Sequence, residues 1–151
     1  MRIVTHAKKL AVVVAMLATS CDRTAHQFAR SASALAIPAS ASVVSFEDQP
    51  SGLLGEDLFA RAEFQLSAAE LEPLVQQAHN LGYTFVDTSK EPAVDVAKRV
   101  GVGQSGLSQI AAQLRFGCKG LFRYRSEGPA DYSVVVLDVT HRRIVVEVLI
   151  L

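Results

Sequence analysis

The sequence predicts an α+β domain: a small antiparallel sheet of about five strands, with one principal helix and a second candidate helix packed on one face. Three observations predict this class. They are a strictly alternating segment at 57–66, a capped amphipathic helix directly after it, and short apolar runs between turn residues in the last third of the chain. These signals all fall within 37–151, so we expect a single domain over that range.

The segment 57–66 predicts a half-buried antiparallel strand. Because strand side chains alternate between the two faces of a sheet, one face of this segment is apolar and the other polar. We expect the polar face, which carries Arg61 and Glu63, to contact solvent. The apolar face consists of Leu58, Ala60, Ala62, Phe64 and Leu66.

The principal helix is expected to start after Ser67. Ser67 and Glu70 have the spacing of a capping box, in which each side chain binds the backbone N–H of the other residue. Gly82 suits the left-handed conformation that ends many helices. A second helix is expected at 108–116, whereas 88–100 is compatible with a short helix or a strand. The stripe of the principal helix contains Leu71, Leu74, Val75, Ala78 and Leu81.

Other apolar runs predict the remaining strands. The runs at 132–138 and 144–151 are almost continuously apolar, which indicates central strands covered on both faces or an association surface. Alternation in the strand from Gly120 places Phe122 in the core and points Arg123 and Arg125 to solvent. We expect strands at 41–47, 83–87, 120–125, 132–138 and 144–151.

The first twenty residues predict an export signal. Arg2, Lys8 and Lys9 form a positive start, and an uncharged apolar run follows at 10–18. As a helix this run is about 14 Å long, against roughly 30 Å of bilayer hydrocarbon, so it is too short for a permanent membrane span. We therefore expect 1–20 to be removed from the mature protein.

The residues that end this signal, LATSC at 17–21, resemble the lipobox of bacterial lipoproteins. That family favours Leu three residues before the cysteine, where this chain has Ala18. The resemblance implies that Cys21 is acylated and becomes the first residue of the mature chain, which is then anchored in a membrane and faces the periplasm. In that family, an Asp at the position of Asp22 favours the inner membrane.

Ordinary signal cleavage is the alternative, because Ala18-Thr19-Ser20 and Ala34-Leu35-Ala36 also fit a small-x-small site. The only other cysteine is Cys118. Acylation of Cys21 would leave Cys118 as a lone thiol, whereas simple secretion would let the two cysteines pair. Residues 21–36 are rich in Ala and Ser and are expected to form a tether, with at most a short helix around Phe28.

Charge is unevenly distributed along the mature chain. Ten acidic residues fall within 47–95, whereas 98–125 contains six basic residues and no acidic one. The two segments could neutralise each other, or the basic one could bind an anionic protein or lipid head groups. Export argues against a nucleic-acid partner. The candidate partner-binding residues are Arg115, Lys119, Arg123 and Arg125.

No other motif predicts a catalytic, metal or cofactor site. Residues 101–106 match GxGxxG, but no convincing strand precedes them and no suitable acid follows, so we interpret them as a glycine loop. The histidines at 26, 79 and 141 lack metal-site spacing. We therefore expect a lipid-anchored bacterial envelope protein that acts by binding. A periplasmic inhibitor or immunity-type protein, and a small envelope hydrolase with an unrecognised site, remain open alternatives.

Overall fold

The computed structural model describes residues 24–51, 57–126, 128 and 131–150. The signal segment, Cys21 and Asp22 lie outside the described residues. The expectations of export, acylation and membrane choice therefore stay predictions.

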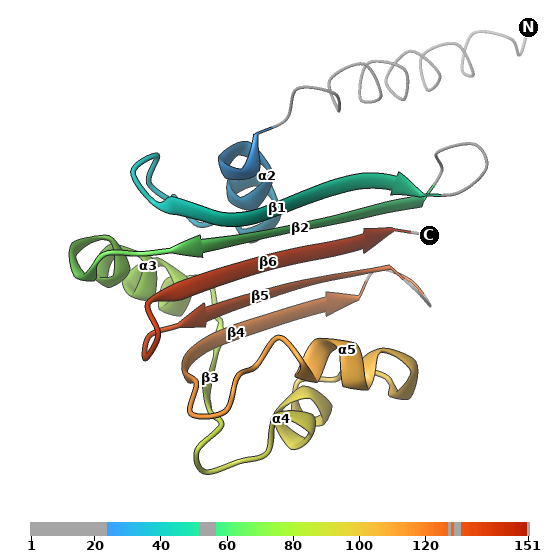
Figure 1. Ribbon diagram of the computed structural model, residues 1–151. Helices are drawn as coiled ribbons and strands as arrows, with labels where there is room; N and C mark the ends of the chain where they lie inside the picture. The colour runs from blue at the N-terminus through green and yellow to red at the C-terminus, as the bar shows by residue number, and fades with distance from the viewer. Residues whose placement is uncertain (1–23, 52–56, 127, 129–130, 151) are drawn as a thin grey trace, which may run out of the picture.

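Six strands form one antiparallel sheet in the order β1-β2-β6-β5-β4-β3 (Figure 1). This confirms the α+β class, and each of the six strands overlaps one of the segments that the sequence predicts as strands. The short segment around 83–87 pairs with β4 and forms one edge of the sheet, and β1 forms the other edge. The strands are β1 (Ser42–Ser51), β2 (Asp57–Gln65), β3 (Thr84–Asp87), β4 (Lys119–Ser126), β5 (Tyr132–Asp138) and β6 (Arg143–Ile150).

Helices cover both faces of this sheet. Neighbouring residues of β4 show this, because Leu121 packs in the same core as Leu74, whereas Phe122 packs in a second core with Ile110. The expectation of helices on one face is therefore wrong, and the two apolar central strands are buried on both sides. Helices α2 (Ala25–Ser33) and α3 (Ala68–Asn80) cover the first face, and α4 (Ala93–Arg99) and α5 (Leu107–Ala111) cover the second.

Residues 24–36 are folded onto the sheet, so the expected tether is wrong over this range. Thr24 caps α2 through a capping box with Gln27. The side chains of Phe28 and Leu35 are 2% and 1% exposed, and they belong to the first core. The Ala-rich composition that suggests a tether instead supplies small residues, which let α2 approach the sheet closely.

Helix α3 forms as its capping box predicts. The Ser67 hydroxyl accepts a hydrogen bond from the Glu70 N–H at 3.2 Å, and the Glu70 carboxylate accepts one from the Ser67 N–H at 2.7 Å. Leu74 and Ala78 are buried against the sheet. Gly82 has a φ of 76°, which confirms the expected left-handed residue after the helix.

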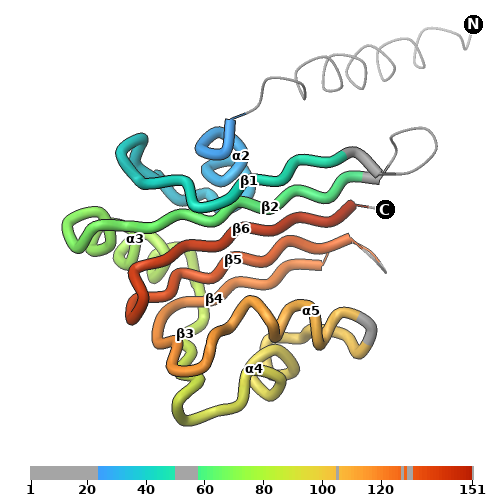
Figure 2. Tube along the Cα trace, in the orientation of Figure 1, coloured from blue at the N-terminus to red at the C-terminus, as the bar shows by residue number. Residues whose placement is uncertain are grey.

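The segment between β3 and β4 lies beside the β4–β3 edge of the sheet (Figure 2). The ambiguous stretch at 88–100 forms a helix, α4, preceded by Pro92. The glycine motif at 101–106 joins α4 to α5 and includes a single turn of 3₁₀ helix at Gln104–Gly106, as a connecting loop does. Helix α5 ends at Ala111, five residues earlier than expected.

Candidate binding groove and the polar cluster on the opposite face

The four basic residues singled out in the sequence do not share one surface. Arg115 bonds to Glu63 on the face covered by α5. Arg123 and Arg125 lie on the opposite face of β4, with Leu121. Lys119 is exposed at the start of the same strand, opposite Asp87. The sheet therefore separates Arg115 from the other three residues.

Arg123 is not solvent-facing, which corrects the sequence-based expectation. Its residue exposure is 9%, because α2 and α3 cover this face of the sheet. One Arg123 nitrogen donates to the Ala32 carbonyl at 2.7 Å, and the guanidinium carbon lies 4.8 Å from the centroid of the Tyr83 ring. Burial raises the pKa of Tyr83 to about 12, although the nearby Arg123 acts in the opposite direction. Arg123 thus holds α2 and Tyr83 together.

A cluster of polar side chains lies between α5 and the sheet. At its centre Glu147 is 1% exposed, and three neutral side chains donate to its carboxylate. The donors are the Tyr132 hydroxyl at 2.7 Å, Gln113 at 3.1 Å and Gln109 at 3.2 Å. Arg61 lies 3.5 Å from the same carboxylate. Since an ionised carboxylate has about four acceptor positions, Glu147 is fully engaged.

A second buried carboxylate, Glu63, contacts three guanidinium groups. Its oxygens lie 3.2 Å from Arg115, 3.3 Å from Arg143 and 3.4 Å from Arg61. The Gln113 carbonyl accepts from Arg143 at 3.1 Å, and the Gln113 side chain accepts from Arg61 at 3.2 Å, so the two carboxylates belong to one network. We call these eight residues the polar cluster: Arg61, Glu63, Gln109, Gln113, Arg115, Tyr132, Arg143 and Glu147.

The polar cluster has the geometry of a structural connection. Its carboxylates from β2 and β6 bind residues of α5 and of the turn after it. Burial, followed by the hydrogen bond to Glu147, raises the pKa of Tyr132 far above its ordinary range, so this phenol stays protonated. The polar face of β2 is therefore covered at Glu63, against the expectation that it contacts solvent.

Cys118 is a free thiol and is fully buried, at the start of β4. Burial, and then the neighbouring Asp138, raise the pKa of this thiol to about 12. Asp138 is itself buried, and its carboxylate lies 2.6 Å from the His141 ring nitrogen Nδ1. A nucleophilic cysteine needs a lowered thiol pKa, so this environment favours an inert thiol.

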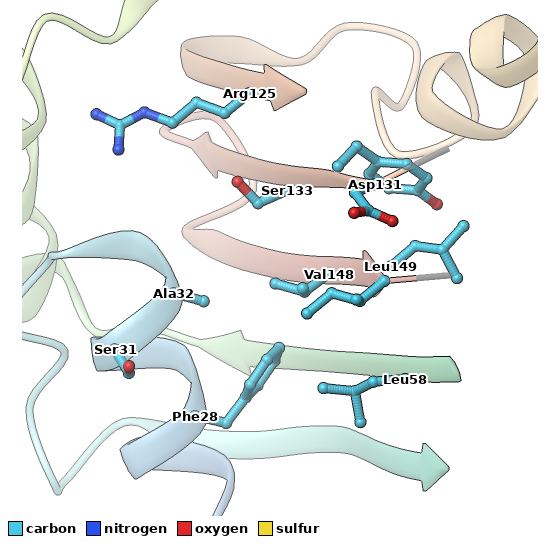
Figure 3. A pocket seen from close by; sticks show the side chains of 11 residues that line it. Phe28, Ser31, Ala32, Leu58, Arg125, Asp131, Ser133, Val148 and Leu149 are labelled. Atoms are coloured by element: carbon cyan, nitrogen blue, oxygen red, sulfur yellow. The ribbon is translucent and has the colours of Figure 1, made fainter. Parts of the chain in front are cut away.

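An open groove lies on the first face of the sheet, between α2 and the ends of four strands (Figure 3). It has a volume of about 440 Å³. The wall on the α2 side includes Phe28, Ser31 and Ala32. The register of the sheet arranges the floor, because Arg125 pairs with Ser133 and Ser133 pairs with Val148. Strand β2 adds Leu58, opposite Ile150 of β6.

This α2 groove is amphipathic. Its half over β6 and β2 is apolar and contains Leu58, Val148 and Ile150. Its half over β4 and β5 is polar and contains Arg125, Ser133 and Asp131. Figure 3 shows Arg125 and Leu58 at opposite ends of the groove. The groove could therefore hold a molecule with one apolar and one charged end.

Sequence reasoning missed the α2 groove because it assigned the wall of the groove to a tether. The available signal was weak. Ala25, Phe28 and Ala29 have the i, i+3, i+4 spacing of one helix face, and all three are buried. Only one of them is large, so the apolar pattern does not stand out.

A second hollow lies between residues 88–93 and the segment that follows α5. It is lined in part by Phe116, whose 88% exposure is the highest of the large apolar residues described. Of its lining residues, Leu114 belongs to the second core and Ala93 packs against that core.

Comparisons with known proteins do not assign this chain to a family. No protein family model matches the chain, and neither does any curated protein or solved structure. Within the described ranges, no helix combines the length and the apolar character that a membrane crossing needs. The same residues contain no group of three or more His, Cys, Asp or Glu side chains placed to hold a metal ion.

Proposed function

We propose that this chain is a lipid-anchored protein of the bacterial cell envelope, and that its domain acts by binding a ligand in the α2 groove. The anchor would be Cys21, on the strength of the LATSC sequence. The groove is the site because it is open and amphipathic, whereas the carboxylates of the polar cluster are already engaged by side chains of the protein.

One observation carries this proposal. Thr24, the capping residue of α2, comes only three residues after Cys21, and α2 forms the wall of the groove. Three extended residues span about 10 Å. An acyl anchor on Cys21 would therefore hold the groove next to the membrane surface, where lipids and membrane proteins are the nearest ligands.

Cell fractionation of Cys21→Ser tests the anchor. Two or three acyl chains hold a protein at the membrane almost permanently, so we expect the wild-type chain in the membrane fraction and Cys21→Ser in the soluble fraction. Cys118→Ala is the matched control, because it removes the other cysteine and should stay with the membrane. Membrane retention of Cys21→Ser would overturn the acylation. A density gradient that separates the two membranes tests the inner-membrane expectation from Asp22.

A further inference from the structure

We infer that the α2 groove binds a single fatty-acid-like anion, with one acyl chain over β6 and β2 and a terminal carboxylate at Arg125. This inference rests on the proposed function, in that it takes the groove as the binding site. It goes further by naming the class of ligand.

The apolar half of the groove calls for an apolar ligand. Leu58 and Val148 are only half-buried, and Ile150 is 43% exposed, although all three lie on the face that elsewhere packs against α2. Phe28 forms the wall beside them. Covering such surface with an alkyl chain gains roughly 25 cal/mol for each Å² of apolar area removed from water.

The polar half supplies a cation at the correct distance from this apolar floor. Arg125, Ser133 and Val148 are successive partners across β4, β5 and β6, and neighbouring strands are about 4.8 Å apart. Val148 and Arg125 are therefore about 10 Å apart across the sheet, so an acyl chain lying over Val148 can place its carboxylate at Arg125. Arg125 is exposed, whereas Arg123 is buried and bound to the Ala32 carbonyl, and no ion pair of Arg125 occurs among the residues that the structure describes. Guanidinium groups bind carboxylates through two parallel hydrogen bonds.

Size and charge favour a carboxylate with one chain. The volume of about 440 Å³ lies in the lower part of the range for small-molecule sites, roughly 300–1,000 Å³. The apolar floor is only two strands wide, which suits one chain and not the two chains of a phospholipid. Arg125 is the one basic side chain among the described residues that line the groove, so a singly charged carboxylate matches it better than a dianionic phosphate.

Calorimetric titration of the full-length Cys21→Ser chain with dodecanoate tests this inference. This variant cannot be acylated, and it needs no detergent that would occupy the groove. We expect one dodecanoate per chain and no binding of acetate, which lacks the chain. Dodecyl maltoside below its micelle concentration lacks the negative charge, and we expect it to bind at least about tenfold more weakly than dodecanoate.

Variants locate the ligand in the groove. Arg125→Gln should weaken dodecanoate binding about tenfold. Lys119→Gln is the matched control, because it removes an exposed cation from the same face of the same strand and should leave binding unchanged. Ile150→Gln should weaken binding severalfold without unfolding the domain, since Ile150 is 43% exposed. Val148→Trp should abolish binding by filling the floor, and its melting curve shows whether it is folded.

Three results would overturn the inference. The first is that the folded chain does not bind dodecanoate. The second is that Arg125→Gln and Ile150→Gln both bind dodecanoate as tightly as the chain without these substitutions. The third is that a lysophospholipid binds more tightly than dodecanoate. These outcomes are distinct from failure of the anchor. If dodecanoate binds but Cys21→Ser stays in the membrane fraction, the groove ligand is supported and the acylation is refuted. If Cys21→Ser is soluble but does not bind dodecanoate, the acyl anchor is supported and the groove ligand is refuted.

Discussion

The two faces of the sheet are held by different interactions. On the first face, α2 and α3 each begin with a capping box, and they pack through apolar side chains. On the second face, α5 has five residues and no side-chain cap. Instead, Gln109 within α5, and Gln113 and Arg115 in the turn after it, bond to two glutamates of the sheet.

This difference follows from helix length. A helix of one or two turns is unstable by itself in water, so its position depends on tertiary contacts. Apolar packing depends on how well the side chains fill the available volume, whereas hydrogen bonds to a buried carboxylate depend on direction and distance. We therefore expect the first face to respond to lost volume and the second to lost charge partners. The following experiments compare the two faces.

The largest effect should come from Glu63→Ala, on the second face. Arg143 would keep its buried guanidinium but lose its carboxylate, and removing one partner of a buried ion pair costs about 3–5 kcal/mol. Urea denaturation measures the free energy of unfolding. Glu72→Ala, on the exposed side of α3, is the control and should change it by less than about 0.5 kcal/mol. A similar small change for Glu63→Ala would mean that the polar cluster does not stabilise the fold.

Leu74→Ala tests how much apolar packing on the first face contributes to the free energy of unfolding. Leu74 is 1% exposed in the first core, so the substitution should cost about 2–5 kcal/mol. Leu71 is only partly buried in the same helix, and Leu71→Ala should cost distinctly less. Equal losses in urea denaturation would show that the burial of α3 differs from the structure described here.

Alkaline pH should act on the second face through Cys118. The native thiol has a pKa raised to about 12 against 9.0 for an ordinary thiol, so the unfolded chain loses this proton at lower pH. The corresponding stability is complete below about pH 9 and is lost as the pH rises towards 12. The free energy of unfolding should therefore fall less steeply above pH 9 in Cys118→Ala than in the wild type. Parallel curves for the two proteins would contradict the raised pKa.

The smallest effects should come from the helix caps of the first face. Thr24→Ala removes the capping hydroxyl of α2, and Ser67→Ala removes that of α3. Each should cost about 1 kcal/mol, measured from thermal or urea unfolding. A loss for Ser67→Ala alone would indicate that α2 contributes little to the folded domain, which would weaken its role as a groove wall.

Local patterns in the sequence were sufficient for much of the fold. The alternation at 57–66 and the capping box at Ser67 predicted β2 and α3, and Gly82 ends that helix as expected. These features depend on neighbouring residues, because side-chain alternation and capping are set within a few residues of the backbone. The buried state of Cys118 also agrees with its apolar character.

The candidate site depended on contacts between distant parts of the chain. Nothing near Phe28 indicates that α2 lies beside β6, so a segment expected to be a tether forms the wall of the groove. Arg123 and Arg125 look equivalent in the sequence, yet only Arg125 reaches the groove, because the carbonyl of Ala32 holds Arg123.

The sequence by itself therefore determined the α+β class, the main helix and most strand positions, along with the resemblance of its first twenty-one residues to a lipoprotein signal. Only the tertiary structure decided which faces are covered and where the polar cluster and the groove lie. The physical reason is that strand alternation assigns each residue to a face, whereas the long-range packing of helices determines what covers that face.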